Sequence, residues 1–180
     1  MPRARPGPRM DSPPRRRARR DISEPSSALS ESLRCTVVRV KLAGTVILPA
    51  YQTAGASGMD IAACKRAVIP AGGFQAVHTG VFLELPEGME VQVRPRSGLA
   101  IRHGIGILNS PGTIDSDYRG EIVVILFNLG GRCFVIQPGD RIAQLVFSGV
   151  TRVRLQPVRV LGTTARGTGG FGHTGRKTRR

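Results

Sequence analysis

Two short segments of the sequence combine side chains that could bind a phosphate ester or catalyse its reaction. Gly112–Gly120 places two carboxylates, a phenol and a guanidinium between two apolar runs. A turn rich in Asp and Gly is most often only a turn, so this segment alone does not establish catalysis. Pro95–Ala100 places a guanidinium, a hydroxyl and a glycine amide at the end of an expected strand. Such donors bind phosphate oxygens at strand-to-helix turns, and they are equally typical of a surface turn.

A third segment, Arg166–Gly175, contains five glycines in ten residues, together with Phe171 and His173. Its composition is similar to that of a glycine loop that cradles phosphates, with one aromatic ring that could stack on a base. A glycine loop by itself is a weak signal. His78, His103 and His173 are not candidates for a catalytic base, although His173 could contact phosphate or sugar.

The elements expected to position these segments are short strands. From Cys35 onward, runs of β-branched and apolar residues are punctuated by Gly and Pro about every eight to twelve positions, which predicts an all-β sandwich or barrel. Only Ser97–Arg102 could form a turn of helix. The expected strands are Thr36–Leu42, Met59–Ala63, Gln75–Leu85, Glu90–Arg94, Gly106–Leu108, Glu121–Asn128, Cys133–Ile136, Arg141–Phe147 and Thr151–Val160.

The charge is concentrated at the ends of the 180-residue chain, which has 27 Lys and Arg against 12 Asp and Glu, a net charge of +15. Residues 1–34 hold nine Arg, four acids and six of the thirteen prolines. They contain few large apolar residues and are predicted to be a disordered extension. It could bind polyanions without specificity, carry a nuclear or organellar address, or be merely solvated. Residues 35–165 would form the β domain, and 166–180 a flexible glycine-rich arm with a basic tail.

Composition excludes several classes of protein. The longest apolar run, Ile122–Phe127, is six residues long, whereas a membrane-spanning helix needs about 20. Cys35, Cys64 and Cys133 form an odd, widely spaced set without a zinc-ligand spacing. We therefore expect buried free thiols in a reducing compartment.

Five segments of the sequence, in their order along the chain, resemble the five motifs of the trimeric dUTPase family, the deoxyuridine triphosphate nucleotidohydrolases. The resemblance covers about residues 35–175. Met59 stands where the first motif often has Tyr, and His173-Thr174 replace the more usual Ser-Thr. The motifs are Ala54–Ile61, Pro95–Ala100, Gly112–Glu121, Gly139–Leu145 and Arg166–Gly175.

This resemblance implies a distorted jelly-roll that forms a homotrimer with its sites at subunit interfaces. It implies hydrolysis of dUTP, with Mg²⁺, to dUMP and pyrophosphate by attack of water on the α-phosphorus. Such a reaction keeps uracil out of DNA and supplies dUMP for thymidylate synthesis. A cytoplasmic location is expected, or an organellar or nuclear one if the basic extension is an address in a eukaryotic host.

The family's roles can be carried over residue by residue. Asp115 would orient and deprotonate the attacking water. Its neighbour Asp117 looks like a solvated turn residue. Tyr118 would lie against the deoxyribose and exclude a 2′-OH, or be a packed strand-end aromatic, and the two roles are compatible. Uracil would be recognised by Asn109 and by the backbone of Thr113 and Ile114, with a further backbone contact from Val123, which could equally be a core valine.

The remaining assignments concern the triphosphate. Arg96, Ser97, Gly98 and Gln144 match the family's phosphate contacts, and Asp60 matches the carboxylate that holds Mg²⁺ through its water shell. Arg166 would reach the γ-phosphate and Phe171 would stack on uracil, with Gly172 beside it, as the arm closes over a neighbouring subunit's site. Arg141 and Asp140 could equally form a structural ion pair at a turn.

Three alternatives remain open. A dCTP deaminase shares this fold, but it carries Glu where this chain has Ile125 and a second Ser where it has Gly98. A basic jelly-roll protein that coats nucleic acid would explain the net charge but not the five motifs. A signalling role on a dUTPase scaffold could exist as a second function.

Overall fold

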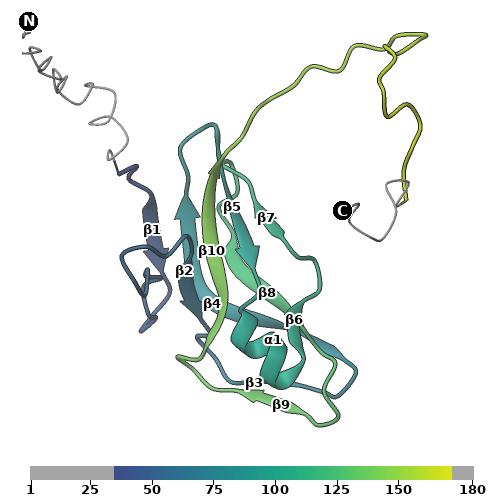
Figure 1. The fold of residues 1–180 in the computed structure, drawn as a ribbon. Helices are drawn as coiled ribbons and strands as arrows, with labels where there is room; N and C mark the ends of the chain where they lie inside the picture. Colours follow the sequence, from purple (N-terminus) through teal and green to yellow (C-terminus); the bar gives the residue numbers. More distant parts are fainter. Residues whose placement is uncertain (1–34, 172–180) are drawn as a thin grey trace, which may run out of the picture. The chain divides into compact units, whose positions relative to one another are not determined.

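The computed structural model describes residues 35–171, and the predictions made for residues 1–34 and for Gly172 and the following tail lie outside them. The described chain is almost entirely β (Figure 1). Its elements are β1 (Arg39–Leu42), β2 (Met59–Ala62), β3 (Ala67–Ile69), β4 (Phe74–Glu84), β5 (Met89–Arg94), α1 (Ser97–His103), β6 (Ile105–Ile107), β7 (Gly112–Ile114), β8 (Glu121–Asn128), β9 (Phe134–Ile136) and β10 (Arg141–Gly149).

Two four-stranded antiparallel sheets share one core. One sheet has the order β1-β4-β8-β6 and the other β2-β10-β5-β7, while β3 and β9 form a separate pair. Alternation along β8 is clean: Ile122, Val124 and Leu126 are buried, whereas Val123 and Ile125 are half-buried on the opposite side. Burying each large aliphatic side chain contributes about 1.5–3 kcal/mol, so this two-sheet core supplies the main stabilisation. The all-β jelly-roll-like prediction is confirmed.

Helix α1 covers the predicted turn Ser97–Arg102 and ends at Gly104, whose φ of 68° is left-handed. The amide of Gly104 donates to the carbonyls of Ala100 and Leu99, which closes the last turn. No helix among residues 35–171 is long and apolar enough to cross a membrane.

The predicted strand Thr151–Val160 is wrong for the single chain, because these residues form no strand (Figure 1). They also lie exposed. The cause is the absence of a partner: β10 already lies between β2 and β5, and a strand needs a neighbour for its backbone hydrogen bonds. Val153, Leu155 and Val160 are therefore left in solvent.

Two strands and the cysteines also differ from expectation. β3 and β7, of three residues each, were not predicted, because runs this short carry no readable alternation. All three cysteines are free, as expected. Cys35 and Cys133 are nevertheless exposed and Cys64 is half-buried, so the prediction of buried thiols is wrong.

Candidate functional site

A carboxylate held by two guanidiniums lies where β2, β10 and the end of β5 meet. Asp60 of β2 faces Gln144 of β10 in the register, and Gln144 faces Arg94 of β5 on its other side. The Asp60 side chain is only 4% exposed. Its Oδ2 accepts from Arg141 Nη1 at 2.9 Å, and its Oδ1 accepts from Gln144 Nε2 at 3.2 Å. Arg96 Nε lies 3.4 Å from the same Oδ1.

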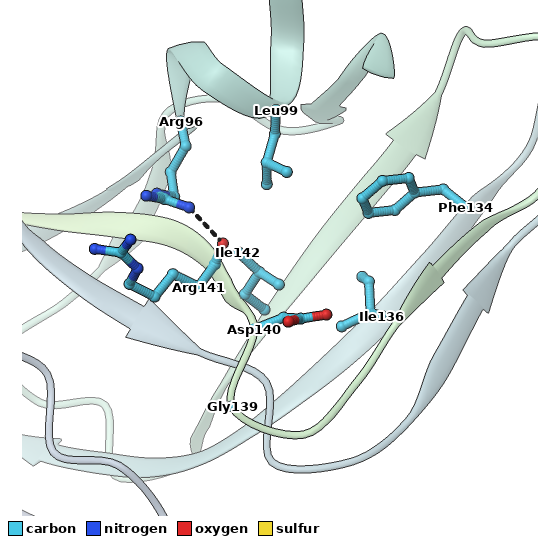
Figure 2. A pocket seen from close by; sticks show the side chains of 8 residues that line it. All are labelled: Arg96, Leu99, Phe134, Ile136, Gly139, Asp140, Arg141 and Ile142. Carbon is cyan, nitrogen blue, oxygen red and sulfur yellow. Dashed lines mark hydrogen bonds between the residues drawn. The ribbon is translucent and has the colours of Figure 1, made fainter. Parts of the chain in front are cut away.

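We call Asp60, Arg96, Arg141 and Gln144 the Asp60 cluster. Two guanidinium charges against one carboxylate leave it with a net charge of +1. Arg96 is tied further to this edge, because its Nη1 donates to the carbonyl of Arg141 at 2.9 Å (Figure 2). A positively charged group of rigidly held donors beside solvent is suited to binding an anion.

A pocket of about 320 Å³ opens beside the cluster. Figure 2 shows the two arginines on one side of it and apolar side chains on the other. The pocket is lined by Arg96, Leu99, Phe134, Ile136, Gly139, Asp140, Arg141 and Ile142.

Arg141 does not pair with its neighbour Asp140, so that alternative is wrong. Its guanidinium binds Asp60 and the Gln52 side chain, the latter at 3.0 Å. The carboxylate of Asp140 instead accepts the amide of Gln137 at 2.7 Å, which closes the turn before β10. Sequence reasoning therefore missed Arg141 as a member of the site. The only sequence feature that pointed to Arg141 was its position three residues before Gln144 in the same motif.

Ser97 and Gly98 open α1 directly after Arg96. The first amides of a helix have no acceptor within it, so these backbone N–H groups are available to an outside partner. The structure thus brings together five of the predicted phosphate and metal residues: Asp60, Arg96, Ser97, Gly98 and Gln144.

Asp115 lies in a different place, directly after β7. Strand β7 pairs with β5, with Ile114 opposite Val91. Asp115 and Glu90 both line a second pocket of about 260 Å³, together with Gly88, Met89, Ser116, Asp117, Val150 and Arg152. Asp115 is exposed, and its carbonyl accepts the amide of Tyr118 at 3.2 Å in a tight turn.

The residues expected to recognise uracil lie on the segment that leads through β7 to Asp115, which we call the β7 segment (Asn109–Asp115). Thr113 and Ile114 belong to β7, and Asn109 lies in the turn before it. At Gly112 a Cβ atom would lie 3.3 Å from Asn109 Nδ2 and 3.4 Å from Val93 Cβ. The absence of a side chain at Gly112 therefore lets the Asn109 amide pack directly on the start of β7.

The two groups of residues are separated within one chain. Asp115 lies beside Glu90 at one end of β5, whereas Arg96 follows its other end, six residues further on. At about 3.3 Å per extended residue this corresponds to roughly 20 Å. One chain does not bring Asp115 to the Asp60 cluster.

Tyr118 and Val123 follow the β7 segment in the chain. The Tyr118 hydroxyl donates to the carbonyl of Glu121 at 3.0 Å, and the residue is 44% exposed. Val123, in the middle of β8, faces His78 of β4. It belongs to the outer side of the sheet, away from the core.

Glu121 ends the motif Gly112–Glu121, but sequence reasoning gave it no role, since its partners lie in another strand. Its carboxylate accepts amides of Thr79 and Gly80 and lies 2.9 Å from His78 Nδ1. Partial burial by itself would raise the pKa of Glu121. The hydrogen bond and charge of His78 and the two amide bonds outweigh it, and the pKa lies below its ordinary value.

The described residues of the glycine-rich arm make local hydrogen bonds. Arg166 Nε donates to the carbonyl of Gly169 at 2.8 Å, within its own turn. Phe171 is fully exposed. The single chain therefore does not place Arg166 or Phe171 against either group of site residues.

Comparison with known proteins agrees with these motifs. The dUTPase family model matches residues 45–175. The deoxyuridine 5′-triphosphate nucleotidohydrolase of Wolinella succinogenes is 53% identical over 148 residues, covering 82% of this chain and 99% of its own. That of Desulfotalea psychrophila is 56% identical over 133 residues, covering 73% and 89%.

Solved structures give the same fold. The dUTPase of Staphylococcus bacteriophage 80alpha with dUPNHPP has a TM-score of 0.71 at 24% identity, covering 79% of this chain and all of its own. A mutant dUTPase of phage phi11 of S. aureus, described with a structural Mg(II) ion, has a TM-score of 0.66 at 20% identity, covering 71% of this chain and all of its own. From the extent of the family match and the identity to these relatives, the chain belongs to the dUTPase family.

Proposed function

We propose that the chain carries out its family's reaction, the hydrolysis of dUTP to dUMP and pyrophosphate, in sites shared between the copies of a homotrimer. The observation that carries this proposal is the separation of the Asp60 cluster from the β7 segment in one chain. In this proposal each group is half of a site. Rotational symmetry in a closed ring would let one copy's Asp60 cluster face another copy's β7 segment.

The Asp60 cluster is proposed to bind the triphosphate. Arg96 supplies a charged donor, Ser97 and Gly98 supply free amides, and Gln144 an amide side chain. Arg141 joins them, because it holds the Asp60 carboxylate and leaves Arg96 less completely neutralised. Guanidiniums suit this task since they present several donors in a planar fork that matches phosphate oxygens.

The β7 segment is proposed to bind uracil and to supply the general base. The backbone of Thr113 and Ile114 offers donors and acceptors to the uracil edge, and so does the side-chain amide of Asn109. Val123 adds a backbone contact. A missing methyl contact discriminates by only about 1–3 kcal/mol, so rejection of dTTP requires a clash at the 5-position. Tyr118 lies against the sugar, and Asp115 takes the proton of the water that attacks the α-phosphorus.

Magnesium is proposed as the cofactor, held mainly by the substrate. Among residues 35–171 no three His, Cys, Asp or Glu side chains cluster to form a metal site. Asp60 already accepts two hydrogen bonds and forms an ion pair with Arg96, and a carboxylate offers about four lone-pair positions. It therefore fits an ion that keeps its water shell, with Asp60 accepting from one such water. Bound there, the ion would screen the charge of the phosphate oxygens.

Two apolar surfaces support assembly into a homotrimer. On the outer side of β4 and β8, Phe74 faces Phe127 and Ala76 faces Ile125. Phe74 is exposed although its neighbours are apolar. The segment after β10 adds further exposed apolar side chains, which need a partner outside their own chain: Val153, Leu155, Val158, Val160 and Leu161.

The glycine-rich arm is proposed to close the site of another copy. Arg166 would then reach the γ-phosphate and Phe171 would stack on uracil, with Gly172 beside it. Phe171 is exposed in the single chain, which agrees with a ring that packs only against a nucleotide bound to another copy. Closure would exclude water and align the α-phosphorus.

A cytoplasmic location is proposed, since the relatives are bacterial enzymes. Deamination of dCTP is disfavoured, because Ile125 is a half-buried aliphatic residue on the outer side of β8 and cannot act as an acid or base. Binding of nucleic acid by the basic extension and a second, signalling role remain separate hypotheses.

A panel of four nucleotides tests the proposed function. We expect the purified protein to release pyrophosphate from dUTP with a kcat/KM at least about a hundredfold above that for UTP, dCTP or dTTP. Mass spectrometry of the nucleotide product should show dUMP. Release of ammonia from dCTP, or equal rates on dUTP and UTP, would contradict the proposal.

A further inference from the structure

The ring of Tyr118 is held against bare backbone. A Cβ atom at Gly120 would overlap the Tyr118 hydroxyl oxygen and Cζ, so the ring occupies the space that a side chain at Gly120 would need. Its hydroxyl donates to the carbonyl of Glu121 at 3.0 Å. The direction of the ring therefore depends on where the backbone of Gly120 and Glu121 lies.

Glu121 fixes that backbone through its own side chain. Its Oε1 accepts the amides of Gly80 at 2.8 Å and Thr79 at 3.1 Å. Its Oε2 lies 2.9 Å from His78 Nδ1. The carboxylate thereby joins the first residue of β8 to three consecutive residues of β4.

These β4 residues lie at a break in the sheet, which gives the carboxylate its partners. The register between β4 and β8 shifts between His78 and Phe82, so a carboxylate replaces strand carbonyls as the acceptor of the two amides. Two further features hold the backbone of β4 at this break. Thr79 Oγ1 donates to the carbonyl of Ile122 at 2.6 Å, and Gly80 has a φ of +68°.

We propose that Glu121 is a positioning residue for sugar selectivity: by binding the β4 break, it holds the carbonyl that orients Tyr118. This inference rests on the proposed function, in which Tyr118 excludes the 2′-OH. Glu121 does not touch the nucleotide. Its effect should therefore appear in the choice between dUTP and UTP rather than in hydrolysis as such.

The test compares kcat/KM for dUTP with kcat/KM for UTP in full-length variants, with folding checked by circular dichroism. Glu121→Ala is expected to lower the dUTP/UTP ratio about tenfold, because a misplaced ring no longer closes the space beside C2′. Glu121→Gln keeps an acceptor for both amides and should stay within about threefold of the parent. Tyr118→Phe removes only the hydroxyl and should lower the ratio about fivefold.

Two controls make the outcome decisive. Glu84→Ala removes a carboxylate from the end of β4, the strand that Glu121 contacts, where Glu84 pairs with Arg39 on the surface, and should leave the ratio unchanged. Tyr118→Ala should lower the ratio most. If Tyr118→Ala has no effect, the proposed role of Tyr118 fails and the inference fails with it. If Tyr118→Ala lowers the ratio while Tyr118→Phe, or a folded Glu121→Ala, keeps the parent value, the positioning role of Glu121 is overturned and the proposed function stands.

Discussion

Replacing Asp115 by asparagine is expected to lower kcat for dUTP at least about a hundredfold. Asparagine keeps the shape and most hydrogen bonds of the side chain but cannot take a proton from water. General-base assistance contributes about 10²- to 10⁴-fold in rate, or about 3–5 kcal/mol of barrier. Nucleotide affinity depends on other residues, so binding of a non-hydrolysable dUTP analogue should stay within about tenfold of the parent. Steady-state kinetics and titration calorimetry measure the two quantities.

Asp117 provides the matched control for this variant. It lies two residues away in the same exposed turn and lines the same pocket as Asp115. Asp117→Asn should retain most of the parent kcat, because that carboxylate is assigned to the turn. Loss of analogue binding in Asp115→Asn, or inactivation by Asp117→Asn, would show that the base is wrongly assigned.

Truncation after Ala165 is expected to lower kcat/KM about a hundredfold while the melting temperature hardly changes. The truncation removes a charge-assisted contact of Arg166, about 1.5–3 kcal/mol, and the stacking of Phe171, about 1–3 kcal/mol. Only about 2.8 kcal/mol of these contributions is needed for a hundredfold change. The described arm residues are largely exposed and outside the core, so stability should not depend on them.

A shorter truncation separates the arm from the basic tail. Removing only residues 176–180, which lie beyond the last motif, should leave kcat/KM near that of the full chain. Thermal unfolding and gel filtration report on folding and assembly of both truncations. Unfolding of the chain truncated after Ala165, or its full activity, would show that the arm is not a lid.

The strands with clear alternation could be predicted from the sequence, and β8 was predicted residue for residue as Glu121–Asn128. The segment Thr151–Val160 has the same kind of pattern and forms no strand. Alternation reports only which side chains seek burial, and pairing depends on a neighbour that one chain lacks here. β7 was missed for the opposite reason, since three residues opposite β5 are fixed by tertiary pairing alone.

The site residues divide in the same way, into those predictable from motif position and those whose role depends on tertiary contacts. Motif position predicted the group formed by Asp60, Arg96 and Gln144, which the structure brings together. It did not predict that Arg141 would bind Asp60 across 81 residues, because a guanidinium beside Asp140 has an obvious local partner. Glu121 was missed for a related reason, since its partners Thr79 and Gly80 are amides exposed only by a register shift in another strand.

Subunit complementation tests the central claim, that each site draws Asp115 and the Asp60 cluster from different copies. Asp115→Asn and Arg96→Ala, each nearly inactive alone, would be unfolded together in equal amounts and refolded into mixed trimers, which native mass spectrometry can count. Random assembly leaves one site in four with both residues intact, so dUTP hydrolysis should recover to about a quarter of the parent rate. The same variants refolded separately and then combined should stay inactive. Mixed trimers with no activity above that of the separate variants would show that each site lies within one chain, and would contradict the account.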